Sequence, residues 1–460
     1  MKSVLKRSTL ILFFTIAFIA GIAFFVVELV VSADDWANQP YNAHISGNGG
    51  LEQAGAIFDR NGIPLAQTVG EDRVYNENYS VRTGLLHTVG DNSLNISTAV
   101  QSKYRSQLTG YSLIWGLNMP QSLRTSHDMT LTVDANTCGA VYDALSAYDT
   151  SGACVVYNYK TGEVICSVST LSYDPQAPPE INKDNEKEYE GVYLDHVLSS
   201  TYTPGSVFKI VTAAAAIENI PDLFERTWYC EGSEEIGGNE ITCVDSEAHG
   251  EINFQEALEH SCNIVFAKLA VEIGAEKMTE TAEKIGVNMS FEIDDVKTPA
   301  GHYDVSKASV NQLAWSGVGQ YNDEVNPMQM AMICGAIGNG GQSVTPTYIK
   351  GGSGDLLELI GMKKSGSRDM FLPSTATKLT EVLPDYTYDD FGGLTVKAKT
   401  GTAEVGEDKK PNAWMVGFST DADCPLAFAC VVENAGFGSQ YAKPVAQTAM
   451  KYASQALKAH

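Results

Sequence analysis

A long apolar run opens the chain. Residues 10–31 are almost continuously apolar, and Lys2, Lys6 and Arg7 precede them. A helix of this length can cross a hydrocarbon core of roughly 30 Å, and cations before such a span favour a cytoplasmic N-terminus. The pattern therefore predicts a cytoplasmic tail over residues 1–9, a transmembrane anchor over residues 10–31 and an extracytoplasmic remainder.

A cleaved signal peptide is the alternative to an anchor. The small residues in Val31-Ser32-Ala33 are compatible with a cleavage site. However, the apolar run is longer than the roughly 7 to 15 residues that are usual in a signal peptide. We therefore predict a single-pass protein of the cell membrane whose folded part lies outside the cell.

The segment after the anchor has short apolar runs separated by turn-forming residues. Gly47-Asn48-Gly49-Gly50 and Asp59-Arg60-Asn61-Gly62 mark two of these turns. This mixed, polar pattern predicts a small stalk domain over residues 32–130. Stronger periodicity begins near Leu131 and predicts a second, larger domain over residues 131–460.

The larger domain combines strand and helix periodicities. Residues 153–157 and 163–167 alternate around a turn at Lys160-Thr161-Gly162 and predict a hairpin. Three more strands are expected over residues 394–404, 413–419 and 425–432. Residues 208–217 form the most apolar helix candidate, and a last helix is expected from about Val445. Strands at both ends with helices between them predict an α+β fold, with a five-stranded antiparallel sheet flanked by helices.

Charge and cysteine spacing narrow the possible functions. The chain of 460 residues carries a formal net charge of -25, whereas a nucleic-acid surface needs clustered Lys and Arg, so nucleic acid is not an expected partner. The nine cysteines include no C-x-x-C pair, and no histidine cluster has zinc spacing, so neither a metal nor a cofactor is expected. Cys230 and Cys243 flank a turn at residues 237–239, which leaves open whether they form a disulfide.

Ser206-Val207-Phe208-Lys209 has the Ser-x-x-Lys spacing of a serine nucleophile and its base. Pro204-Gly205 marks a helix start, and residues three apart share one helix face. A lysine can take the proton of a serine hydroxyl only if desolvation lowers its pKa, and the apolar run after Lys209 predicts such an environment. The spacing alone is weak evidence, because Ser3-Val4-Leu5-Lys6 also matches it.

Two further motifs follow in order along the chain. Ser261-Cys262-Asn263 is a Ser-x-Asn triplet, although similar triplets begin at Ser46, Ser93 and Ser309. Lys399-Thr400-Gly401-Thr402 contains the Lys-Thr-Gly that comes after both other motifs, and alternation predicts that it lies on a strand. Gly401 would let a ligand backbone approach this strand, along which a peptide could pair.

The three motifs in this order resemble those of the penicillin-recognising serine enzymes. Over most of the expected extracytoplasmic part, the chain resembles class B penicillin-binding proteins, and its short stalk is most like that of their compact PbpA-type members. Further matching segments are residues 56–62, 130–134, 160–165, 173–175, 202–206, 249–250, 413–414 and 417–418. Ala54-Gly55 replaces the usual Arg-Gly of the stalk signature, and Val207 replaces a commoner threonine.

The resemblance implies a D,D-transpeptidase that cross-links peptidoglycan. Ser206 would attack the D-Ala-D-Ala carbonyl of a stem peptide with Lys209 as base, and a neighbouring stem peptide would then take the acyl group. Ser261 and Asn263 would relay protons and position the substrate. The backbone N–H groups of Ser206 and Thr402 would form the oxyanion hole.

The same resemblance implies how substrates and inhibitors bind. Lys399, Thr400 and Thr402, with Gly401 between them, would hold the terminal carboxylate of the substrate. Expected partners are peptidoglycan stem peptides, β-lactam antibiotics that acylate Ser206, the membrane, and a SEDS-type glycosyltransferase.

Three alternatives stay open at this point. Transfer of the acyl group to water would make a D,D-carboxypeptidase or a β-lactamase-type hydrolase, although the anchor and stalk favour transpeptidation. A non-enzymatic scaffold that activates a glycan polymerase is the second alternative. In the third, Ser206 merely caps a helix, Lys209 snorkels so that its charged end reaches solvent, and Lys399 is a solvated charge on a strand.

Overall fold

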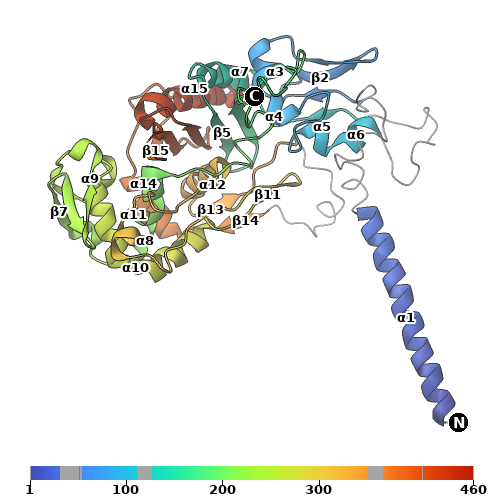
Figure 1. Ribbon diagram of the computed structural model, residues 1–460, viewed down its shortest axis with the longest axis horizontal. Helices are drawn as coiled ribbons and strands as arrows, with labels where there is room; N and C mark the ends of the chain where they lie inside the picture. Colours follow the sequence, from blue (N-terminus) through green and yellow to red (C-terminus); the bar gives the residue numbers. More distant parts are fainter. Residues whose placement is uncertain are drawn as a thin grey trace.

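The computed structural model describes residues 2–31, 51, 54–110, 127–350, 366–406 and 408–458. Helix α1, Lys2–Val31, projects away from the rest of the protein (Figure 1). Its segment Lys6–Glu28 is long and apolar enough to cross a membrane, and none of the apolar window is buried. The helix begins before the predicted span at residue 10, since the lysines and arginine at its start are good helix formers.

Short strands and helices lie between α1 and the large sheet. A four-stranded sheet has the order β3-β2-β1-β4, with β1 Ile57–Phe58, β2 Pro64–Val69, β3 Asp72–Tyr75 and β4 Met129–Thr130. Among the described residues of this region, the helices are α3 Tyr79–Gly84, α4 Leu86–Val89, α5 Val100–Lys103 and α6 Arg105–Thr109. The predicted turn at residues 59–62 joins β1 to β2, where Asp59 Oδ1 accepts from the amides of Asn61 and Ile63 at 2.8 Å each. The other predicted turn, at residues 47–50, lies outside the described residues, and the boundaries of a stalk domain stay a prediction.

A five-stranded antiparallel sheet lies at the centre of the larger region, as predicted. Its order is β15-β16-β17-β5-β6. The strands are β5 Gly152–Asn158, β6 Val164–Thr170, β15 Val396–Ala403, β16 Asn412–Ser419 and β17 Leu426–Val432. Because β17 pairs with β5, the first hairpin joins the strands from the C-terminal part of the chain. Every residue of β5, β6, β16 and β17 is buried, so both faces of the sheet are covered.

Helices pack on the two faces of this sheet (Figure 1). Helices α7, Ala135–Ser146, and α15, Gly438–Lys458, cover one face, and α12, Pro327–Gly338, covers the other. The last helix was expected from about Val445 but starts earlier and runs through Pro444. Because proline has no backbone N–H, it normally marks a helix boundary, so the first part of this helix was not predicted.

A mainly helical region extends from the sheet. Its elements include α8 Lys209–Asn219, α9 Phe254–Glu259, α10 Asn263–Ile285, α11 Val310–Ser316 and α14 Pro373–Val382. Small ribbons pair β7 Thr227–Cys230 with β10 Gly250–Asn253, and β8 Ser233–Ile236 with β9 Asn239–Thr242. Two further short pairs are β11 Glu292–Ile293 with β12 Val296–Lys297 and β13 Gln342–Val344 with β14 Ser367–Asp369. Residues 209–216 of α8 are all buried, which matches the prediction of a central apolar helix.

Trp414 connects the sheet to the segment that enters this helical region. It is fully buried on β16, and its Nε1 donates to the carbonyl oxygen of Thr203 at 3.0 Å. Trp414→Phe leaves that acceptor without its donor and removes buried volume, so we expect the free energy of unfolding to fall by about 1–3 kcal/mol. Urea denaturation followed by circular dichroism measures the change. Trp315→Phe, at a half-buried position on α11, is the control, and an equal loss in both variants would contradict a special role for Trp414.

Candidate active site

Ser206 lies on a tight turn that leads into α8. The sequence predicted that Ser206 lies in the first turn of the α-helix. Instead, the turn is a 3-10 segment, Gly205–Phe208, that precedes the helix. Gly205 has φ +54°, and a Cβ at this position would lie 2.6 Å from the carbonyl oxygen of Thr402. Only glycine therefore lets the turn pack directly against β15 in this conformation. The side chain of Ser206 stays half-buried, so a ligand can reach it.

Lys209 is completely buried one turn further on. Its Nζ lies 2.5 Å from the carbonyl oxygen of Ser261, 3.1 Å from Ser261 Oγ and 2.7 Å from Asn263 Oδ1. Burial, reinforced by the positive charge of Lys399, holds the pKa of Lys209 well below its ordinary value. These surroundings favour the neutral amine, which is the form that can accept a proton.

Ser261 lies on the connection between α9 and α10, and Asn263 is the first residue of α10. Ser261 has φ +56°, a left-handed conformation that is unusual for a residue with a side chain. Asn263 Nδ2 donates to the carbonyl oxygen of Thr242 at 2.8 Å, which turns Oδ1 toward Lys209. Strained backbone of this kind persists only where its surroundings hold it, and it concentrates at functional sites.

The side chain of Lys399 extends from β15 to the hydroxyl of Ser261. It is 1% exposed, and its Nζ donates to Ser261 Oγ and to the carbonyl oxygen of Thr400, each at 2.9 Å. Burial lowers the pKa of Lys399 to about 7. The hydroxyl of Ser261 therefore lies between two lysine amines, and it can accept a hydrogen bond from one while donating to the other.

Strand β15 forms one edge of the five-stranded sheet. The amide of Tyr386 donates to the carbonyl oxygen of Val396 at 2.9 Å, and the amide of Ala398 donates to the carbonyl oxygen of Pro384 at 3.1 Å. These two strand residues therefore direct their backbone groups outward, and alternation gives the same direction to residues 400 and 402. The N–H of Thr402 thus points to the edge against which the Ser206 turn packs.

These groups together can carry out acyl transfer. A neutral buried amine can take the proton of a hydroxyl, and backbone N–H groups at the strand edge can stabilise an oxyanion. In its charged form Lys399, flanked by the half-buried side chains of Thr400 and Thr402, would attract a carboxylate. The structure thus brings Lys209, Ser261 and Asn263 together with Lys399 of β15, beside the Ser206 turn.

The fold also separates the repeated motifs. Ser3-Val4-Leu5-Lys6 lies on α1, and Lys160-Thr161-Gly162 forms the turn between β5 and β6, as predicted, with φ +83° at Gly162. Ser309 caps the N-terminus of α11, and Ser93 lies in the loop before α5. Ser46 lies outside the described residues.

One cluster of side chains departs from the sequence analysis. Cys230 and Cys243 are not joined by a disulfide, because their sulfurs are 3.7 Å apart against about 2.05 Å in an S–S bond. With His249 and Cys262 they form a group whose potential ligand atoms all lie within 4.8 Å of one another. No metal site was predicted, because the four residues are irregularly spaced in sequence and only the fold brings them together.

Residues 152–451 match the penicillin binding protein transpeptidase domain. The chain belongs to this family. The matched region runs from β5 of the five-stranded sheet into α15. It includes the Ser206 turn, residues 261–263 and β15.

Over the aligned residues, relatives of known name are about a quarter identical to this penicillin-binding protein. Penicillin-binding protein 3 of Bacillus subtilis is 28% identical over 75% of this chain and 55% of its own length. Peptidoglycan D,D-transpeptidase PbpA of Mycolicibacterium smegmatis is 26% identical over 62% of each chain. The chain thus matches 55% to 62% of the length of these two relatives.

Solved structures show the same fold. The ceftriaxone acyl-enzyme complex of penicillin-binding protein A from M. tuberculosis has a TM-score of 0.72 at 23% identity, and the match covers 88% of this chain and 98% of that one. The D,D-transpeptidase domain of a peptidoglycan glycosyltransferase from Eggerthella lenta has a TM-score of 0.69, also at 23% identity, over 89% of this chain and 98% of that one.

Proposed function

We propose that this penicillin-binding protein is a peptidoglycan D,D-transpeptidase that works through an acyl-enzyme on Ser206. The observation that carries the proposal is the convergence of two buried lysines, Lys209 and Lys399, on Ser261 Oγ beside the Ser206 turn. The family membership supports it, as do relatives named D,D-transpeptidases and a fold neighbour captured as a β-lactam acyl-enzyme.

The first half-reaction acylates the serine. Ser206 Oγ bonds to the carbonyl carbon of the penultimate D-Ala of a stem peptide, and its proton passes to the neutral Nζ of Lys209. The oxyanion accepts hydrogen bonds from the backbone N–H groups of Ser206 and Thr402, where losing one donor typically costs roughly 100-fold to 1,000-fold in rate. The peptide C–N bond then breaks, and the departing D-Ala amine receives a proton through the hydroxyl of Ser261.

The second half-reaction transfers the acyl group. The amine of a neighbouring stem peptide attacks the Ser206 ester, a proton leaves that amine for Lys209, and Ser206 Oγ regains a proton as the ester bond breaks. Asn263 holds the base, since its Oδ1 lies 2.7 Å from Lys209 Nζ. A β-lactam enters the same first step, but its leaving group stays tethered, so Ser206 remains acylated.

The carboxylate of the substrate fits the strand side of the site. Lys399 supplies a positive charge, and Thr400 and Thr402 supply hydroxyls, while Gly401 presents no side chain. A Cβ at Gly401 would lie 2.9 Å from the side chain of Val207, so glycine also keeps β15 close to the Ser206 turn. The outward backbone groups of Val396 and Ala398 already pair with residues 386 and 384, so an extended peptide would pair with β15 further along, at residues 400–402.

We further propose a single-pass topology with the site outside the cell. The cations at residues 2, 6 and 7, and the exposed apolar side chains of α1, support a cytoplasmic tail over residues 1–9 and an anchor over 10–31. A stalk over residues 32–130 would then carry the transpeptidase domain, residues 131–460. The exposed face of α1 offers a surface for a membrane partner, for which we propose a SEDS-type glycosyltransferase.

Intact-mass spectrometry of the full chain with benzylpenicillin tests the proposal. We expect one penicilloyl adduct that persists on the wild type, maps to the peptide containing Ser206 and is absent from Ser206→Ala. Incubation with a D-Ala-D-Ala pentapeptide and an amine acceptor then separates cross-linking from release of free D-Ala by water.

Each other result would overturn part of the proposal. An adduct on another residue, or neither adduct nor drug hydrolysis, would remove Ser206 as the nucleophile. Rapid drug hydrolysis that depends on Ser206, or release of D-Ala without transfer to the amine, would replace the transpeptidase by a hydrolase.

A further inference from the structure

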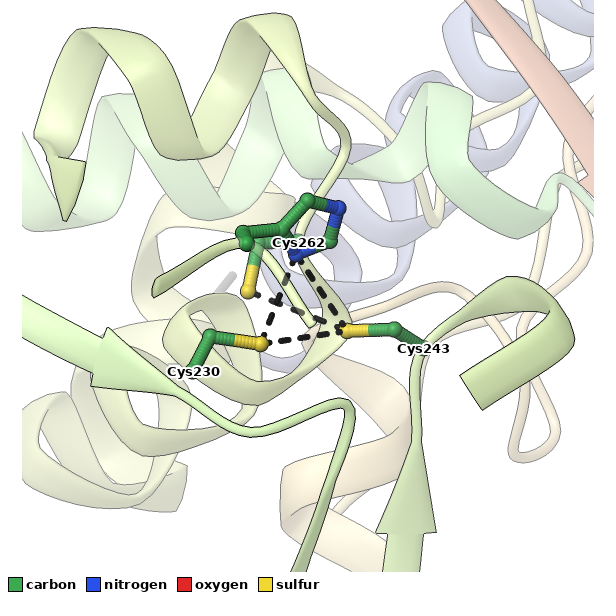
Figure 2. Close-up of side chains that lie close together, drawn as sticks. Cys230, Cys243 and Cys262 are labelled. Atoms are coloured by element: carbon green, nitrogen blue, oxygen red, sulfur yellow. Dashed lines mark hydrogen bonds between the residues drawn. The ribbon is translucent and has the colours of Figure 1, made fainter. Parts of the chain in front are cut away.

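Four side chains that the proposed chemistry does not use converge next to the active site. Cys230 ends β7, Cys243 follows β9, His249 precedes β10, and Cys262 caps the N-terminus of α10. The three cysteines are buried and the histidine is half-buried. Figure 2 shows the sulfur atoms of the labelled cysteines turned toward one another from separate segments.

The distances within this cluster have the size of a metal coordination shell. The sulfur of Cys243 lies 3.7 Å from that of Cys230 and 3.8 Å from that of Cys262. Nδ1 of His249 lies 3.4 Å from the sulfur of Cys230 and 3.8 Å from that of Cys243. Around tetrahedral zinc, with bonds of about 2.3 Å to sulfur and 2.05 Å to nitrogen, neighbouring sulfurs lie about 3.8 Å apart and sulfur and nitrogen about 3.6 Å apart.

We propose that Cys230, Cys243, His249 and Cys262 bind one zinc ion as a structural site. Three thiolates and one imidazole form a donor set that zinc prefers, whereas magnesium and calcium prefer oxygen ligands. The protein fills all four positions of a tetrahedron, so no place is left for a substrate or a catalytic water. The ion therefore acts on the fold rather than on the substrate.

The site joins two short ribbons to the start of α10. The ribbons β7–β10 and β8–β9 are two-stranded, and such short ribbons are marginally stable alone. Zinc bonds from both ribbons to the start of α10 fix them to the helical region. The ligands lie 13, 6 and 13 residues apart along the chain, so they become a site only when these ribbons have formed.

The site also reaches the proposed active site through one residue. Cys262 lies between Ser261, with its φ of +56°, and Asn263, and these two neighbours contact Lys209 Nζ. A metal bond at the sulfur of Cys262 restrains the backbone on both sides, and so helps to hold Ser261 in its strained conformation. Cys262 is therefore a positioning residue, and this consequence, unlike zinc binding itself, rests on the proposed function.

Metal analysis of the full-length chain, purified in detergent from zinc-supplemented cells, tests the site directly. We expect about one zinc per chain, as in other closed Cys₃His sites. Replacing zinc by Co²⁺ should give the visible and near-ultraviolet bands of a tetrahedral cobalt–thiolate centre. Zinc well below stoichiometry that added Zn²⁺ does not restore, stoichiometric iron, or a disulfide between Cys230 and Cys243 would each overturn the proposal.

Variants locate the ligands and separate the site from catalysis. Cys243→Ser should lose most of its zinc and melt at a lower temperature, whereas Cys424→Ser, at another buried cysteine, should keep the metal. Full zinc retention in Cys243→Ser would contradict the assignment. If Cys243→Ser does not fold, chelation of the wild type decides instead, because the melting temperature should fall and should recover on adding Zn²⁺.

The acylation rate gives a separate readout for the positioning role. Removing zinc from the wild type should slow adduct formation with benzylpenicillin several-fold, and added Zn²⁺ should restore the rate. An unchanged rate in zinc-free protein would overturn the positioning role and leave the metal site standing. Zinc binding in a chain that never forms an adduct would instead contradict the proposed transpeptidase and leave the metal site intact.

Discussion

Replacing Lys209 by methionine is expected to slow acylation of Ser206 by benzylpenicillin about 100-fold to 10,000-fold, the usual contribution of a general base. Methionine keeps an unbranched apolar stem in the buried position but removes the amine. Burial and the charge of Lys399 keep the pKa of Lys209 low, so in the wild type this amine is free to take the hydroxyl proton. The second-order rate constant of adduct formation, followed by intact mass over time, measures the effect.

Lys160→Met is the matched control for this experiment. Lys160 belongs to the other Lys-Thr-Gly, in the exposed turn between β5 and β6, and we expect its loss to leave the acylation rate within about two-fold, since surface substitutions usually have small effects. Circular dichroism and melting curves check that both variants fold. A rate in Lys209→Met close to that of wild type would show that another group takes the proton.

The sheet was predictable because its strands are short, apolar and bounded by turns. Gly162 shows this well: its φ of +83° closes the predicted hairpin between β5 and β6. The site residues were predictable because the order of three motifs is specific, even though each motif recurs by chance elsewhere. Sequence order cannot tell how the motifs meet, and the meeting point is Ser261 Oγ between two buried amines.

What the sequence did not predict depends on contacts between distant segments. The 3-10 turn at Ser206 exists because Gly205 packs against Thr402, almost two hundred residues away. Helix-start motifs depend only on neighbouring residues, so they cannot predict the effect of that contact. The cysteine and histidine cluster was missed for the same reason. Cys262 belongs both to the Ser-x-Asn triplet and to the cysteine and histidine cluster. Only the triplet can be recognised in the sequence.

Acylation is also expected to fall as pH rises through about 7, because that is where buried Lys399 loses its proton. Below this pH the folded protein holds a cation for the substrate or β-lactam carboxylate, and above it the amine is neutral and attracts the anion less. On the acid side the rate should fall as well, since protonated Lys209 cannot accept a proton. The second-order acylation rate constant measured against pH should therefore be bell-shaped, reporting groups of the free enzyme.

Two variants assign the alkaline side of this profile. Lys399→Gln removes the charge at every pH, and we expect the rate constant to fall by about 30-fold or more, which corresponds to the loss of roughly 2 kcal/mol from a buried charged contact. Lys399→Arg keeps a charge that does not titrate in this range, so its alkaline decline should disappear even if its overall rate is lower. If Lys399→Arg declines at the same pH as the wild type, another group controls that limb, and the carboxylate-binding role of Lys399 would have to be given up.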